Sequence, residues 1–146
     1  MDMLARTGLE PQEALVCTMV LVAAAGGGIS DREIGMMAGL VQTLPVFHNF
    51  SSKRLEAATE AVVALLREDD GLNHAARLIR ESLEPRLRET AYALACEVVA
   101  ADRFAEQDSL RMLEFVKNEL NLDALVAAAI ERGARARHQL VELART

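Results

Sequence analysis

The sequence predicts an all-α protein, and three observations support this prediction. First, the 146-residue chain suits a single domain with a substantial core, so we expect residues 1–146 to form one bundle of about seven to eight helices. Second, 51% of the residues are hydrophobic but only 3% are aromatic. Leu, Ala, Met and Val must then fill the core, and the first three are good helix formers. Third, apolar residues recur with helical spacing, and the sequence has no alternating strand pattern of useful length.

An internal repeat with an offset of 75 residues indicates that the bundle contains two pseudo-symmetric helix–loop–helix units. Residues 20–33 run from an apolar, Ala-rich helix into a tight break and then into an acidic helix start, and residues 95–108 repeat this order. The register continues further along the chain. Three apolar pairs coincide there: Met37 with Met112, Leu40 with Phe115, and Val41 with Val116.

The first helix is expected between Pro11 and the glycines at 26–28. Proline suits the first turn of a helix, and residues 14–25 are apolar almost all round, as in a buried helix. The second helix begins at Ser30, because Ser30 and Glu33 have the spacing of a capping box.

The second helix is expected to end before Pro45, and it contains Gly35 and Gly39 four residues apart. These two glycines would let another helix approach closely, so we expect a packing surface there. A short loop then leads to a third helix, which is capped by Ser51 or Ser52.

Four more helices follow. A fourth covers about residues 72–83, a proline opens a fifth whose buried part covers 91–101, and a sixth covers 106–120. A seventh begins near Asn121 or Asp123.

The seventh helix is expected to end or bend at Gly133, and the tail to continue helically to Leu143. The two most apolar helices, at 11–25 and 86–101, should pack at the centre, with the amphipathic helices around them. The apolar positions of these outer helices include Ile34, Leu110 and Leu125.

Charge and hydropathy exclude several classes of function. The net charge of −6 argues against nucleic-acid binding, which needs Lys and Arg to neutralise phosphates. The longest apolar stretch, residues 14–25, is too short to cross a bilayer, and the N-terminus lacks the features of a signal peptide. We therefore expect a cytoplasmic protein without a membrane span. Its two cysteines, Cys17 and Cys96, should be buried, reduced thiols.

One basic cluster near the C-terminus allows two interpretations. Its cations can complement the dipole at the end of a helix, or they can bind an anionic partner. The cluster consists of Arg132, Arg135, Arg137 and His138.

Acidic residues gather at both repeated loops. The second loop carries Asp102, Glu106 and Asp108 where the chain folds back, and the first carries Asp31 and Glu33. Clustered carboxylates suit hard divalent cations such as Ca²⁺ or Mg²⁺, although the spacing is not that of an EF-hand. Acids at these positions also stabilise helix N-termini without any ion. Both interpretations stay open.

The sequence contains no established catalytic or Cys/His metal motif. His48, His74 and His138 are scattered, and nothing activates the two thiols in their apolar surroundings. The leading hypothesis is a non-enzymatic module that binds a protein partner together with a divalent cation. The alternatives are a metal-free adaptor, using an exposed helical groove or the Gly35–Gly39 face, and an enzyme with a catalytic carboxylate pair.

The repeated motif resembles that of the TerB family of tellurite-resistance proteins. Residues 25–33 and 101–108 are similar to the family's Ala-Asp-Gly-x-apolar pattern with its following acids, and residues 115–122 resemble the tail of its second repeat. The resemblance covers residues 12–124, and residues 125–146 add a C-terminal helix and tail.

This resemblance implies a compact bundle of seven or eight helices, an acidic surface that binds metal, and a role in tellurite or general chemical stress. It also implies a protein partner, such as a membrane-bound or calcium-binding tellurite-resistance component at the inner face of the cytoplasmic membrane. Related domains occur joined to J-domain co-chaperones. A homodimer is a further arrangement that the sequence leaves open.

The two loops differ in how far they follow the family pattern. Gly27 stands at the Asp position of the first loop, and Arg103 stands at the Gly position of the second loop. An ion is therefore expected at the second loop first, although Asp108 there replaces a Glu of the family pattern. By position, the acids that match the family are Asp31, Glu33, Asp102 and Asp108.

Overall fold

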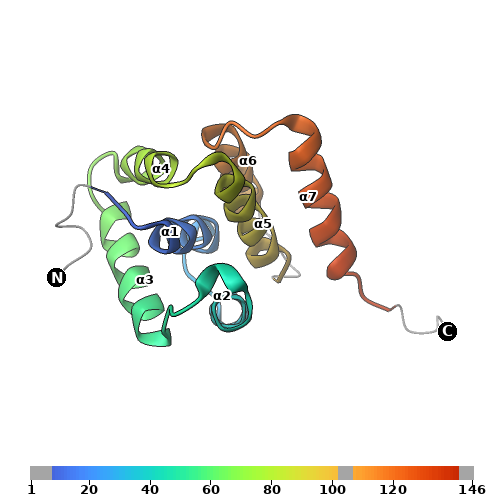
Figure 1. Cartoon of the computed structure of the whole chain (residues 1–146), viewed down its shortest axis with the longest axis horizontal. Helices are drawn as coiled ribbons and strands as arrows, with labels where there is room; N and C mark the ends of the chain where they lie inside the picture. The colour runs from blue at the N-terminus through green and yellow to red at the C-terminus, as the bar shows by residue number, and fades with distance from the viewer. Residues whose placement is uncertain (1–7, 102–106, 142–146) are drawn as a thin grey trace.

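The computed structural model describes residues 8–101 and 107–141, and within these ranges the chain is helical without any strand, which confirms the predicted all-α class (Figure 1). Seven α-helices and one short 3-10 helix are present in them. In chain order they are α1 (Pro11–Ala24), α2 (Asp31–Thr43), η2 (Pro45–Phe47), α3 (Ser52–Leu66), α4 (Gly71–Ser82), α5 (Pro85–Ala101), α6 (Gln107–Glu119) and α7 (Ala124–Arg137).

The helix starts follow the chemistry that the sequence predicted. Ser30 Oγ accepts a hydrogen bond from the Glu33 backbone N–H at 3.1 Å, and Glu33 Oε1 accepts one from the Ser30 N–H at 2.8 Å, so the capping box is confirmed. Of the alternatives that the sequence left open, Ser51 caps α3 and Asp123 caps α7.

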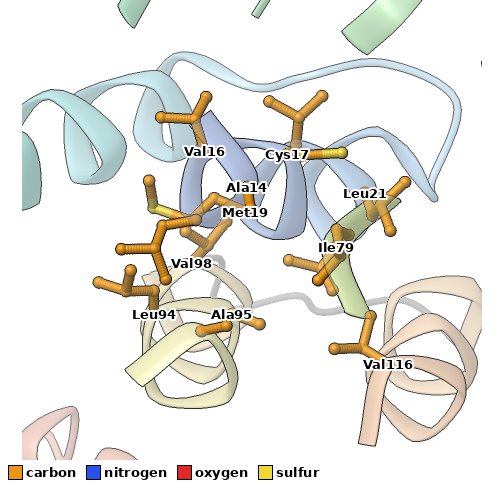
Figure 2. Close-up of a cluster of buried hydrophobic side chains, with 14 of the residues drawn as sticks. Ala14, Val16, Cys17, Met19, Leu21, Ile79, Leu94, Ala95, Val98 and Val116 are labelled. Atoms are coloured by element: carbon orange, nitrogen blue, oxygen red, sulfur yellow. The ribbon is translucent and has the colours of Figure 1, made fainter. Parts of the chain in front are cut away.

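The two most apolar helices, α1 and α5, lie at the centre, as predicted. Every residue of α1 from Glu13 to Ala23 is buried. Figure 2 shows the underside of α1 facing Leu94, Ala95 and Val98 of α5, with Val116 of α6 beside them. α3, α4 and α6 pack around α1, so that it has neighbours on several sides.

The two repeated units pack in a crossed arrangement. Within its own unit α1 contacts α3, and α5 contacts the equivalent helix α7. Between the units α1 contacts α6, and α5 contacts the equivalent helix α2. Each central helix is therefore covered by the helix that follows the other one's loop. The repeat-related residues Val41 and Val116 are only 4% and 3% exposed, and both belong to the core. α4 joins the two units and packs on α1 and α3.

Three apolar positions of the outer helices are exposed. Their exposed fractions are 51% for Ile34, 48% for Leu110 and 78% for Leu125. Helical spacing identifies the apolar side of a helix. That side is buried only where another helix comes close enough to cover it. α2, α6 and α7 lie on the outside of the bundle, so part of their apolar surface meets solvent (Figure 1).

Close helix packing at Gly35 and Gly39, and a helix end at Gly133, are not found within the described ranges. A Cβ atom built at Gly35 or Gly39 meets nothing within 4 Å, so within the described ranges no helix approaches them. Gly133 neither ends nor interrupts α7, which continues to Arg137. The expected helical tail to Leu143 is not formed as far as the structure describes it, because residues 139–141 are not helical.

Candidate functional site

The acids predicted at the second loop are only partly visible in the structure. Asp102 and Glu106 lie outside the described residues, and Asp108 is exposed in the first turn of α6. In the ranges 8–101 and 107–141, no three His, Cys, Asp or Glu side chains are grouped so that they could hold a metal ion. The second-loop cation site therefore stays a prediction.

The acids of the first loop have different surroundings. Asp31 is exposed in the first turn of α2, whereas Glu33 is only 4% exposed and its carboxylate accepts a hydrogen bond from the Ser30 N–H. The capping role that the sequence allowed is realised at Glu33.

A groove of about 400 Å³ lies between α5, α6 and α7. In the first unit α2 packs on α3, whereas in the second unit the equivalent helices α6 and α7 form the two walls of this groove. Its apolar lining consists of Val99, Ala100, Leu110, Leu113 and Ala134, and its polar lining of Tyr92, Cys96, Glu114, Lys117, Glu131 and Arg135.

A connected polar network runs through the groove. The Tyr92 hydroxyl donates a hydrogen bond of 2.5 Å to Glu131 Oε2, and Lys117 Nζ lies 2.9 Å from Glu114 and 3.8 Å from Glu131. Burial, and then the hydrogen bond to Glu131, raise the pKa of Tyr92 above its usual value. Tyr92 therefore stays protonated and acts as a fixed donor that orients Glu131.

The two cysteines are buried and reduced, as predicted. Burial raises the pKa of Cys17 to about 12, and the pKa of Cys96 to about 12 as well. Because the thiolate is the reactive form of cysteine, both thiols are poor nucleophiles near neutral pH. Cys96 lines the groove but supplies no activated sulfur to it.

A second polar cluster fastens the end of α7 to α5. Glu97 accepts hydrogen bonds from both the Nε and a terminal nitrogen of Arg137, the first at 2.9 Å, and its other oxygen lies 3.1 Å from His138 Nε2. Burial raises the pKa of the Glu97 carboxyl, but the hydrogen bonds from Arg137 and His138 outweigh this effect and hold the pKa below its usual value. Part of the basic C-terminal cluster thus has an internal carboxylate partner.

Replacing Glu97 with glutamine is expected to cost about 1 kcal/mol of stability at pH 7, because a charged acceptor is lost at a partly exposed site. The folded pKa of Glu97 is depressed, so its contribution is present above the unfolded pKa near 4.5 and disappears as the pH falls through the folded value. Urea unfolding of both proteins at pH 7 and at about pH 3.5 measures the difference.

The matched control is Glu60→Gln, at an exposed glutamate of α3. This change should shift stability by less than about 0.5 kcal/mol at either pH. A penalty for Glu97→Gln that is the same at both pH values would contradict the ionic role of the carboxylate.

Sequence reasoning missed both polar clusters, although it had one signal for each. Tyr92 is the only tyrosine of the chain, and Glu97 is the only charged residue inside the apolar stretch 91–101. A polar group in a buried helix must find a partner, which here comes from α7. Comparison of the chain with protein-family models, curated proteins and solved structures finds no match.

Proposed function

We propose that the protein is a non-enzymatic, TerB-like stress-response module that works in the cytoplasm and binds a protein partner. We also propose that it holds a divalent cation at the loop between α5 and α6. The observation that supports this best is the fold itself. Two matching helical units pack in a crossed arrangement. In each unit an acidic helix start follows the central helix, with Asp31 in the first turn of α2 and Asp108 in the first turn of α6.

The groove chemistry favours binding over catalysis. A general acid or base needs a free group with a pKa near the working pH, within reach of a substrate. Here Glu131 is engaged by Tyr92 and Lys117, Glu114 is engaged by Lys117, and the thiol of Cys96 is held protonated. These groups hold one another in place, which suits a rigid binding surface.

Calorimetric titration with Ca²⁺, Mg²⁺, Mn²⁺ and Zn²⁺ tests the cation. We expect one of these ions to bind, and the double variant Asp102→Ala/Asp108→Ala to weaken its binding about tenfold or more, because oxygen ligands dominate such sites. The matched control is Asp69→Ala/Glu81→Ala, which removes two exposed acids elsewhere and should leave the affinity unchanged. If none of the four ions gives heat, the cation is removed from the proposal.

Growth of a deletion strain on tellurite tests the stress role. Cells without the gene should become sensitive, and the wild-type gene should restore growth. Equal growth of the deletion strain and its parent on tellurite and on other oxidants would contradict this role. The second candidate, a metal-free helical adaptor, is favoured by the groove between α5, α6 and α7, which can bind a partner without any ion.

Membrane insertion has no support from the helices. Within the described ranges, each helix is either too short or too polar to serve as a transmembrane span. We therefore propose that any action at the cytoplasmic membrane proceeds through a membrane-bound partner.

A further inference from the structure

Helix α7 is attached to the bundle by fewer neighbours than its counterpart in the first unit. Among the described residues, α5 is the only helix on which α7 packs extensively, whereas α3 packs on α1, α2 and α4. Figure 1 shows α7 at the edge of the bundle, and the groove lies between it and α6. We propose that α7 is a releasable strap, which leaves α5 as one unit while α1 to α6 stay folded. This inference depends on neither the cation nor the partner proposed above.

The apolar contact that holds α7 is small. Over its length α7 buries two side chains, Ala127 and Ala134, and each offers a single methyl group. Ile130 is partly buried against the core, but Leu125 is 78% exposed. The equivalent helix α3 buries a valine and a leucine in addition to an alanine. Because hydrophobic stabilisation grows with the apolar area removed from water, packing holds α7 less firmly than α3.

A middle clip joins α7 to α5 about halfway along its length. Glu131 accepts the hydrogen bond from the Tyr92 hydroxyl, and Lys117 of α6 lies 3.8 Å from the same carboxylate oxygen. The Glu131 side chain is 33% exposed. A charge-assisted hydrogen bond is directional and fixes the position of α7, but a partly exposed carboxylate regains water as soon as the helix moves away.

An end clip joins the last turn of α7 to α5. Glu97 of α5 accepts hydrogen bonds from Arg137, and its other carboxylate oxygen lies 3.1 Å from His138 Nε2. The Arg137 side chain is 56% exposed, and an ion pair that water can reach contributes little stability. The two clips therefore specify one closed position of α7 without making it permanent.

The connection between α6 and α7 provides a hinge. Leu120 is 2% exposed and anchors the end of α6 in the core. Asn121 then has a φ of 51°, and Asp123 caps the first turn of α7. Because the capping side chain belongs to the same segment as the helix, release from α5 does not break the cap. A rotation of the backbone at residues 121–123 is sufficient to move the whole helix.

Release of α7 uncovers one face of α5. Tyr92, Cys96 and Val99 lie on this face at helical spacing, and they are 1%, 4% and 6% exposed in the closed state. All three line the groove together with Ala134 of α7. The strap therefore controls access to an apolar surface and to the Cys96 thiol.

Native-state hydrogen exchange of the full chain tests the release. We expect the amides of α7 from Ala127 onward to share one protection factor, at least about 100-fold lower than that of the α1 amides. A helix of 14 residues is marginal in water by itself, so its amides lose protection once it leaves α5. Protection of α7 equal to that of α1 would overturn the inference, because α7 would then open only with the whole bundle.

Glu97→Gln distinguishes release of the whole helix from fraying of its end. The variant weakens the end clip, and release as one unit predicts about fivefold faster exchange at Ala127 as well as at Arg137. Faster exchange in the last turn alone would show fraying and would contradict the strap. Tyr92→Phe removes the middle clip, keeps the ring and should also speed exchange along all of α7. The control Glu60→Gln, at an exposed glutamate of α3, should leave α7 unchanged.

Thiol labelling measures exposure of the α5 face. Alkylation followed by mass spectrometry reads Cys96 and Cys17 in one sample, and Cys17, which is 0% exposed on α1, is the internal control. We expect Arg137→Gln to speed labelling of Cys96 about fivefold, and to leave Cys17 and the control variant Arg77→Gln unchanged.

The direction of this effect separates opening of the strap from a local change of charge. Burial raises the pKa of Cys96, and the nearby Arg137 charge lowers it. Loss of that charge alone would therefore raise the pKa and slow the labelling. Slower or unchanged labelling of Cys96 in Arg137→Gln would overturn the inference, whereas faster labelling requires that α7 uncovers the thiol.

Discussion

Replacing Leu21 with alanine is expected to lower the free energy of unfolding by about 3–5 kcal/mol. Leu21 is 1% exposed and lies on α1 beside Ile79 of α4 and Val116 of α6 (Figure 2). These side chains already border a void of about 10 Å³. The truncated side chain would enlarge this void, and the surrounding helices cannot close it, because α1 also packs on α3 and α5.

Urea and thermal unfolding measure this effect. For a chain of this size, each kcal/mol corresponds to about 2–4 °C in Tm, so Tm should fall by roughly 10 °C. Leu125→Ala removes the same atoms from a side chain that is 78% exposed, and it should change stability by less than about 0.5 kcal/mol. A loss below about 1 kcal/mol for Leu21→Ala would contradict the central position of α1.

Replacing Gly71 with alanine is expected to destabilise the protein by about 3 kcal/mol through a backbone clash. Gly71 is buried at the start of α4, directly after Asp70, whose φ of 56° turns the chain sharply. A Cβ atom there would lie 2.2 Å from the Leu65 carbonyl oxygen and 3.1 Å from the Leu66 Cα. Both atoms belong to the backbone of α3, so relief requires that α3 and α4 move apart.

Gly35→Ala is the matched control for this prediction. Gly35 lies inside α2 with open space around its Cα, so alanine should stabilise the protein by about 0.5–1 kcal/mol through its higher helix propensity. The two substitutions add the same methyl group and should change Tm in opposite directions. A stabilising effect of Gly71→Ala would show that the α3–α4 turn tolerates a side chain.

Local signals in the sequence predicted most of the fold. Pro11 opens α1, the Ser30–Glu33 pair caps α2, and Asp123 caps α7, because each acts on a neighbouring turn and needs no distant partner. The central position of α1 followed from its apolar character all round, which only burial from several sides explains.

The sequence did not predict which apolar helix faces are left uncovered by another helix. Leu110 and Leu125 have the spacing of core residues, but helical periodicity reports only the apolar side of a helix and not the distance to the next one. The groove depends on that distance. Its polar network was equally hidden, because Tyr92 and Glu131 are 39 residues apart and come together only through the packing of α7 on α5.

The crossed arrangement of α2 and α6 has a consequence for how the chain acquires its structure. Because α2 packs on α5 and α6 packs on α1, part of the core forms only when helices from both halves of the sequence meet. The long-range contacts must form before the central helices are shielded from water, so the domain folds as one cooperative unit, at a rate limited by chain topology. A peptide of half this length would bury the same faces only by exchanging helices with a second copy of itself.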